Sequence, residues 1–440
     1  MTTLNDTFNW IDHRIKQTQT LERVGHVAQV TGLIIESEGP EVSLGDVVII
    51  HSDHNKISVE AEVVGFKENR VLLMALGELK AIHPGCPVIA SSQNSSLSIG
   101  NALVGRIING LGKPIDGKGP LKTDQICNLY KTPPNPMKRI PITKAFETGV
   151  KAIDTFTPLG CGQRMGIFSG SGVGKSTLLG MIARGSEADI NVIALVGERG
   201  RELREFIEND LGPEGIAKSI VVISTSDQSA PLRLRAAMVA TRVAEYFRDQ
   251  NKKVLFLMDS VTRFAMAQRE IGLAIGEPPA SRGYTPSVFS MLPRLMERAG
   301  MSESGSITAL YTVLVEGDDF NEPVADAVRG ILDGHIILSR SLATANHFPS
   351  IDVLDSVSRL VRTICSDQEL EIVSMARDLL ALYRKNEDLI NIGAYTPKTN
   401  PRLDLAINKY ELLMNFLKQK YNIQLPRHES LRKIEEIMRS

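Results

Sequence analysis

Cysteines, aromatic side chains and long apolar runs are all scarce in this sequence, and these shortages exclude several kinds of site. Four cysteines occur among 440 residues and no two form a CxxC pair, which argues for a reducing compartment and against a structural zinc site. No run approaches the roughly 18 apolar residues of a membrane-spanning helix. The polar N-terminal stretch has no apolar segment of the kind that a secretory signal contains. We therefore expect a cytoplasmic protein.

Net charge is also lacking, because 50 Lys and Arg residues oppose 51 Asp and Glu residues. This balance produces no overall field that would attract nucleic acid or an anionic membrane, although it does not exclude a local patch. The eight histidines have no metal-ligand spacing, and we expect ordinary solvated or hydrogen-bonded side chains. Cys161 lies near the glycine-rich segment discussed below, and we interpret it as a reduced thiol rather than a redox sensor.

Four regions differ in character. Residues 1–22 predict a short polar helix, either a frayed terminus or a docking segment for a partner. Residues 23–93 contain short β-rich runs between turn residues, a spacing typical of a small barrel. In residues 94–364 a Gly- and Pro-rich stretch precedes apolar runs that alternate with helical ones, which indicates a mostly parallel sheet covered on both faces. Residues 365–440 have apolar residues at three- and four-residue spacing and predict a helical domain.

The predicted barrel is a poor candidate for binding RNA. Barrels that bind single strands use exposed aromatic side chains in a basic groove. Between Arg23 and Ala90 the only aromatic residue is Phe66, and basic residues are balanced by acidic ones. We therefore expect no nucleic-acid partner.

The stretch FSGSGVGKSTLL (168–179) has the features of a phosphate-binding loop. An apolar strand precedes three spaced glycines, which let the backbone approach an anion and turn its N–H groups inward. A helix follows, and its N-terminus adds a positive dipole end. Lys175 is placed to reach the β- and γ-phosphates, and the hydroxyl of Ser176 to bind Mg²⁺. The residues expected to contact nucleotide are Ser169, Gly170, Ser171, Gly172, Val173, Gly174, Lys175, Ser176 and Thr177.

Two carboxylates follow later strands. Asp259 ends the apolar run KVLFLMD, where a carboxylate is the usual second Mg²⁺ anchor of a P-loop site; alone, it could also be a strand-terminal turn. Glu198 follows VIALVG and could polarise the attacking water, or could be a solvated loop acid. Its neighbours Arg199 and Arg201 are either phosphate contacts or surface charges.

The segment GERGRE (197–202) is similar to the one that carries the catalytic glutamate in the α/β family of rotary and export ATPases. PSIDVLDSVS (349–358) fits that family's signature. The segments 259–290 and 315–340 most resemble the flagellar and type III protein-export ATPases. The resemblance runs from about residue 23 to the C-terminus. It implies a RecA-like P-loop domain between the barrel and the helical domain, and ATP and Mg²⁺ as the nucleotide and metal.

The resemblance also implies roles for individual residues. Lys175 and Ser176 match the lysine and the metal-binding hydroxyl of the P-loop. Glu198 matches the general base that activates water, and Arg199 is its charged neighbour. Asp259 matches the aspartate on the metal side of the site.

Further matches complete the implied site. Glu202 is a second charged neighbour of the base, and Arg263 matches an arginine that lines the same site. Phe348 occupies the place of an aromatic that packs on adenine. Arg359 matches the arginine finger that one subunit donates to the next. Ser169 departs from the glycine of the rotary catalytic subunits, but export-type members often have a small residue there, so we expect no loss of function.

The function that the resemblance implies is a Mg²⁺-dependent ATPase that energises protein export by a flagellar or virulence-type apparatus. It further implies a homohexamer with a site between neighbouring subunits, placed at the cytoplasmic face of the apparatus with only peripheral membrane association. The implied partners are a stator or regulator at the N-terminal segment, a central stalk protein, membrane proteins of the export gate, and export chaperones and substrates. The resemblance does not decide between flagellum and injectisome.

Three other hypotheses remain at this point. The chain could be the catalytic subunit of a rotary proton-translocating ATP synthase, although the 260–340 segment looks export-like. An RNA-translocating ring is disfavoured by the barrel's lack of aromatic side chains. The chain could also be a platform for export chaperones with a purely structural ATP site, which would need no Glu198. Substitution of Glu198 by glutamine separates this hypothesis from the enzymatic ones.

Overall fold

The computed structural model describes residues 24–52, 57–79, 81–91, 96–315 and 319–440. None of the helices that these residues form is long and apolar enough to cross a membrane. The predicted helix of residues 1–22 lies outside the described residues. The chain divides into two compact units. One runs to Ser96 and includes Ala274–Gly276, and the other comprises Leu97–Leu273 and Glu277–Ser440.

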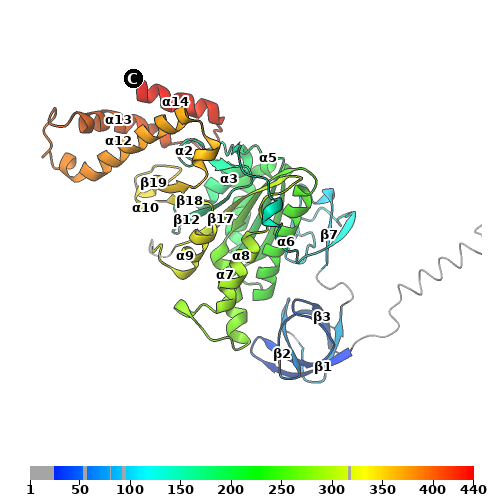
Figure 1. The fold of residues 1–440 in the computed structure, drawn as a ribbon. Helices are drawn as coiled ribbons and strands as arrows, with labels where there is room; N and C mark the ends of the chain where they lie inside the picture. The colour runs from blue at the N-terminus through cyan, green and yellow to red at the C-terminus, as the bar shows by residue number, and fades with distance from the viewer. Residues whose placement is uncertain (1–23, 53–56, 80, 92–95, 316–318) are drawn as a thin grey trace, which may run out of the picture. The chain divides into compact units, whose positions relative to one another are not determined.

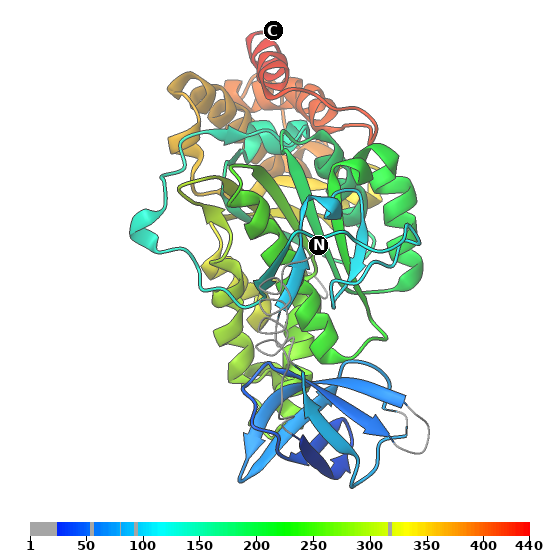
Figure 2. The same ribbon diagram turned by 90° about the vertical axis from the view of Figure 1, so that its right-hand side faces the viewer.

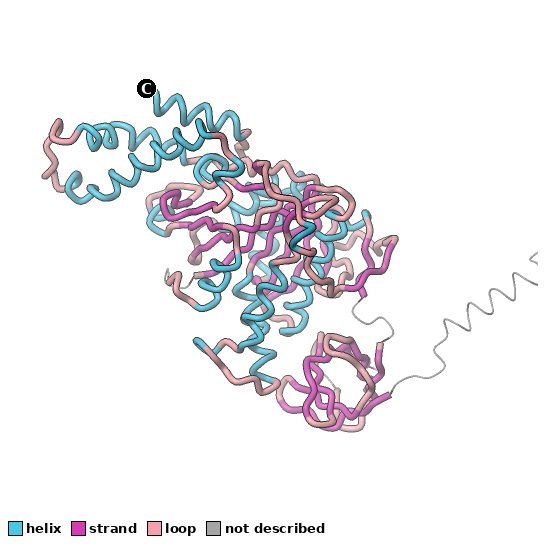
Figure 3. Tube along the Cα trace, in the orientation of Figure 1, coloured by secondary structure: helices cyan, strands magenta, loops and turns pink. Residues whose placement is uncertain are grey.

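Six antiparallel strands close the first unit into a barrel in the order β1-β2-β5-β4-β3-β6, seen as a ring of strands in Figure 3. Alternate residues of β4, such as Val59, Ala61 and Val63, are buried, because successive side chains of a strand point to opposite faces. The strands are β1 (Val24–Thr31), β2 (Ile34–Glu38), β3 (Val47–Ser52), β4 (Ile57–Lys67), β5 (Arg70–Ala75) and β6 (Pro87–Ala90).

The second unit is built on a nine-stranded sheet with the order β19-β18-β12-β17-β15-β13-β14-β8, and β16 pairs with β17. All neighbours from β18 to β8 are parallel, whereas β19 and β16 are antiparallel to their partners. The strands are β8 (Ile107–Asn109), β12 (Arg164–Ser169), β13 (Ile190–Glu198), β14 (Ser219–Thr225), β15 (Lys253–Asp259), β16 (Gly300–Met301), β17 (Ser306–Leu314), β18 (Gly334–Leu338) and β19 (Ile351–Ser358).

Helices lie on either side of this sheet (Figures 1 and 2). Every residue of β13 is buried, as expected for a parallel strand that is covered on both faces. The helices are α2 (Lys151–Phe156), α3 (Lys175–Gly185), α4 (Gly200–Glu205), α5 (Gly212–Ala217), α6 (Ala230–Arg248), α7 (Val261–Ala274), α8 (Pro286–Met296), α9 (Pro323–Ile331), α10 (Arg340–Thr344) and α11 (Val361–Ile364), with a π-helical turn η3 (Phe206–Leu211) between α4 and α5.

Short elements join the sheet to its surroundings. Two small two-stranded sheets, β7 with β9 and the antiparallel pair of β10 with β11, are separate from the main sheet. The elements are β7 (Ser96–Ile99), η1 (Asn101–Leu103), β9 (Gln125–Asn128), η2 (Pro136–Lys138), β10 (Ala145–Phe146), β11 (Leu159–Gly160) and η4 (Ser281–Gly283).

Three helices, α12 (Asp367–Asn391), α13 (Pro401–Leu417) and α14 (Arg427–Arg439), end the chain at the top of Figure 1. α12 begins with a capping box, in which Ser366 and Glu369 satisfy each other's backbone N–H groups. Tyr383 of α12 stacks on Tyr410 of α13 with their ring centroids 3.6 Å apart. The predicted fold class is therefore confirmed in all three parts.

Candidate functional site

The glycine-rich loop joins the end of β12 to the start of α3. Gly172 and Gly174 have φ angles of +76° and +88°, a left-handed conformation that glycine adopts without strain. Ser169, in contrast, is the last residue of β12. It is not one of the described residues that have a positive φ angle. A serine can therefore stand where the standard pattern has glycine, because the backbone there is ordinary strand.

Most predicted loop residues line a cavity of about 740 Å³. The exception is Val173, whose side chain is buried and whose carbonyl oxygen accepts a hydrogen bond from Ser350 Oγ at 2.6 Å. The cavity volume lies in the range of ligand sites, about 300–1,000 Å³. The loop residues on its wall are Ser169, Gly170, Ser171, Gly172, Gly174, Lys175, Ser176 and Thr177.

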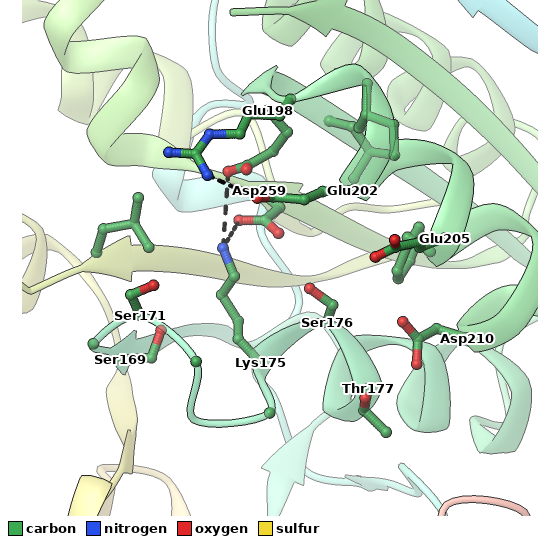
Figure 4. Close-up of a pocket in the computed structure, with 18 of the residues that line it drawn as sticks. Ser169, Ser171, Lys175, Ser176, Thr177, Glu198, Glu202, Glu205, Asp210 and Asp259 are labelled. Carbon is green, nitrogen blue, oxygen red and sulfur yellow. Dashed lines mark hydrogen bonds and ion pairs between the residues drawn. The ribbon is translucent and has the colours of Figure 1, made fainter.

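Lys175 points from the loop to the two predicted carboxylates (Figure 4). Its Nζ lies 2.5 Å from Asp259 Oδ1 and 3.8 Å from Glu198 Oε1. The sheet brings the acids together, because β13 and β15 are parallel neighbours with Leu195 opposite Asp259. Both strands end at the edge where ligands of parallel sheets bind.

The charges of this trio affect one another. Burial raises the pKa of Glu198, and the negative charge of Asp259 raises it further. Burial opposes the charged form of Lys175, but Asp259 and Glu198 outweigh this effect and hold the lysine's pKa above its usual value. Thr312 Oγ1 also donates a hydrogen bond of 2.7 Å to Asp259 Oδ1. Glu198 is thus a better proton acceptor than an exposed glutamate.

The backbone before Glu198 is adapted to this position. Gly197 has a φ angle of +72°, and the pairing of β13 with β14 shifts register between Val196 and Glu198. A Cβ at Gly197 would lie 2.9 Å from Arg263 Cβ. Arg263 itself lines the cavity, and its buried Nε has no hydrogen-bond partner among the described residues. This donor suits an anion that the protein does not supply.

The flank of the cavity formed by α4 and η3 contributes further charged residues. Arg199 is largely exposed and pairs with Glu202 at 3.3 Å. Glu205 and Asp210 face Ser176 and Thr177 in Figure 4. Burial raises the pKa of Asp210, and a hydrogen bond with Thr177 partly offsets this rise.

Three charged residues that line this cavity were missed by sequence reasoning: Glu205, Asp210 and Arg340. Arg340 comes shortly after β18 ends at Leu338. Glu198 and Asp259 were predicted because they lie at the ends of apolar runs. A search for charged residues at the end of every apolar run would also have found Arg340. Glu205 and Asp210 lie on a helical segment that carries no such sequence signal.

The residues present fit a magnesium ion bound together with phosphate. Ser176 is exposed at the cavity, and Asp259 is the neighbouring carboxylate. No group of three or more His, Cys, Asp or Glu side chains in the described ranges could hold a metal ion. Mg²⁺ typically needs only one or two protein carboxylates when substrate phosphates complete its shell.

A second cavity, of about 870 Å³, lies on the other side of Gly174. Phe348 is 42% exposed there, and its ring lies 3.4 Å from the position of a Cβ on Gly174. Residues 418–422 also line this cavity, a contribution that sequence reasoning missed as well. The exposed ring of Phe348 offers this cavity an apolar surface on which another flat ring could stack.

Arg359 is not brought to Lys175 within one chain. It directly follows β19, and its Nη2 donates a hydrogen bond of 3.4 Å to the carbonyl oxygen of Arg329. It is absent from the described residues that line the two cavities. Of the residues predicted for catalysis or for Mg²⁺, the fold does bring Lys175, Ser176, Glu198 and Asp259 to one cavity.

Comparison with known proteins agrees with this three-part structure. The ATP synthase alpha/beta family models match residues 27–91 (beta-barrel domain) and 149–358 (nucleotide-binding domain). The model of the T3SS EscN ATPase C-terminal domain matches residues 365–436. The barrel and C-terminal matches thus follow the changes of architecture along the chain.

Sequence similarity to relatives extends over nearly the whole length of this chain. The chain is 55% identical to the flagellum-specific ATP synthase of Bacillus subtilis, over 92% of this chain and 93% of that protein. It is 49% identical to the type 3 secretion system ATPase of Xanthomonas euvesicatoria, over 90% of each. The assembled ATPase EscN of enteropathogenic E. coli superposes with a TM-score of 0.89 at 42% identity, over 94% of this chain and 99% of that one. EscN in complex with its central stalk EscO gives a TM-score of 0.86 at the same identity and coverage.

Proposed function

The chain belongs to the flagellar and type III secretion ATPases, and we propose that it hydrolyses ATP to energise protein export. The observation that carries this function is the Lys175–Asp259–Glu198 trio at the end of the phosphate-binding loop. The match of residues 365–436 to a type III secretion C-terminal domain favours export over a rotary ATP synthase.

The loop and its neighbours have separate tasks in the proposed reaction. Backbone N–H groups of the loop hold the phosphates, and Lys175 neutralises their charge. Mg²⁺, when bound at Ser176 and Asp259, supplies Lewis-acid neutralisation of the phosphate oxygens. Glu198 orients the water and takes its proton, which its raised pKa favours. Arg263 lines the cavity, and we assign its Nε, which has no hydrogen-bond partner among the described residues, to the γ-phosphate.

We assign the role of the arginine finger to Arg359 of a neighbouring subunit. The position of Arg359 outside both cavities supports this assignment. An arginine finger accelerates phosphoryl transfer by roughly 10³–10⁵-fold, so an isolated protomer should be a poor enzyme. A homohexameric ring would complete each site, in keeping with the assembled form of EscN.

The remaining assignments follow from the relatives. A central stalk protein is the expected partner of the ring, by analogy with EscN and EscO. A stator at residues 1–22, export-gate membrane proteins, and chaperones with their substrates are further proposed partners. We place the ring at the cytoplasmic face of the apparatus, with peripheral membrane association only.

Substitution of Glu198 tests the enzymatic role. E198Q should retain nucleotide affinity but lose at least about 100-fold in turnover, since general-base catalysis contributes roughly 10²–10⁴-fold. Phosphate release and binding of a fluorescent ATP analogue would be measured on the full chain. E208Q is the matched control, because Glu208 pairs with Arg204 outside the cavity. If E198Q kept wild-type turnover, the proposed role of Glu198 would be wrong, and the hypothesis of a purely structural ATP site would remain.

A further inference from the structure

The segment between α13 and α14, residues 418–426, is here called the connector. It belongs to the C-terminal helical region by sequence, yet its first five residues line the same cavity as Phe348. Tyr421 is 61% exposed, so packing of its own side chain does not hold this wall in place. The position of the connector must therefore come from other contacts.

Gln419 supplies most of these contacts. The residue is 8% exposed, and its backbone N donates a hydrogen bond of 2.9 Å to the carbonyl oxygen of Phe348. Its side-chain Nε2 donates to the carbonyl oxygens of Gly149 and Ile423, both at 2.8 Å. Its Oε1 accepts from the backbone N of Lys151, also at 2.8 Å. Both amide donors and the amide oxygen are thus engaged.

These bonds join three stretches of backbone that are far apart in the sequence. They link the loop that carries Phe348, the start of α2 at Gly149 and Lys151, and the second half of the connector. All partners of Gln419 are main-chain atoms, so the residue sets the spacing of the backbones rather than the choice of side chains. A buried amide is costly to remove because each lost partner stays unpaired.

Two side chains of the nucleotide-binding region add to this arrangement. Lys151 Nζ donates a hydrogen bond of 2.9 Å to the carbonyl oxygen of Lys418. Arg184, near the end of α3, donates from Nη2 to the carbonyl oxygen of Tyr421 at 2.7 Å. The connector's carbonyl groups are therefore held from both α2 and α3.

We propose that Gln419 is a positioning residue that sets the separation between Phe348 and the connector, and thereby the affinity for the nucleotide base. This rests on the proposed function, because it takes the second cavity as the place of the base. A base gains affinity when it stacks on an aromatic ring, and this gain requires the residues around it to be correctly spaced. Gln419 acts through the main chain of Phe348, of the segment that begins α2 and of the connector, and not on the phosphates.

The test replaces Gln419 by methionine, which has a similar shape but cannot make these side-chain hydrogen bonds. Q419M should raise the KM for ATP about tenfold, within the range of the stacking free energy. The inhibition constant of tripolyphosphate, which has no base, should stay within about twofold, as should kcat. Q424M is the control, because Gln424 is an exposed glutamine of the same connector.

A purely structural role would give a different pattern. It would lower the melting temperature without raising the KM for ATP, or weaken ATP and tripolyphosphate equally, and either result would overturn the proposal. If Q419M does not fold, R184M decides, because it removes one solvent-accessible bond to the connector. Its KM for ATP should rise about two- to threefold, and an unchanged KM would contradict the proposal. Failure of tripolyphosphate to compete with ATP in the wild type would instead contradict the proposed site.

Discussion

The cavity assigned to the phosphates and the cavity assigned to the base meet at Gly174 but are built differently. The first is enclosed by strand ends, and the side chains of Lys175 and Asp259 are only 13% and 6% exposed. The second has more open aromatic walls, with Phe348 42% and Tyr421 61% exposed. We call the first cavity the phosphate half of the site and the second cavity the base half. We infer that the buried, charged phosphate half determines the rate of turnover, whereas the open base half determines the affinity for ATP.

The largest effect is expected from Arg359, which lies outside both halves. R359A should lose roughly 10³–10⁵-fold in turnover, or about 4–7 kcal/mol of transition-state stabilisation. When R359A subunits are mixed with inactive K175M subunits, activity should return. The R359A subunits have an intact phosphate-binding loop, and in a mixed ring the neighbouring K175M subunit supplies Arg359. Phosphate release would be compared for the two variants alone and mixed. Mixed rings without recovered activity would show that the finger does not come from a neighbour.

A smaller effect is expected from a substitution that displaces Glu198 in the phosphate half but removes no charged side chain. G197A should lower turnover about 10- to 100-fold, because its Cβ would lie 2.9 Å from that of Arg263 and shift Glu198. The free energy of unfolding should fall by about 1–3 kcal/mol because the φ angle is positive. G200A is the control, since nothing lies within 4 Å of a Cβ there. Steady-state kinetics and denaturant unfolding would measure both effects, and equal turnover in the two variants would be evidence against the displacement.

The smallest effect is expected in the base half. F348A should raise the KM for ATP about tenfold through lost stacking, while kcat stays within about twofold. Inhibition by tripolyphosphate should not change, because Phe348 does not line the phosphate cavity. Competition kinetics on the assembled enzyme would measure these constants. A fall in kcat equal to the rise in KM would remove the distinction between the halves.

Much of the phosphate half could be predicted from the sequence. Lys175 and Ser176 belong to a continuous motif, and Glu198 and Asp259 each end an apolar run. Such signals are local: a strand end and a glycine pattern can be read within a dozen residues. At Ser169 the local backbone does not require glycine, because it continues the strand.

The base half could not be predicted to the same extent. Phe348 was found through a family resemblance, but residues 418–422, which line the same cavity, lie about 70 residues later in the chain. Nothing in LKQKYNIQ (417–424) marks Gln419 as a residue that joins Gly149, Lys151 and Phe348. Its role depends on hydrogen bonds to main-chain atoms, which leave no pattern in the partner sequences.

Local conformational preferences and hydrophobic periodicity encode the barrel, the parallel sheet, the C-terminal helices and the glycine-rich loop, so these features could be predicted from the amino-acid order. The order of β17, β15 and β13 beside β12, which brings Glu198 and Asp259 to Lys175, became visible only in the folded chain. The same holds for the return of the connector to α2 and α3. Strand order and loop docking depend on contacts between distant segments, and the free energy of these contacts is shared by the whole fold.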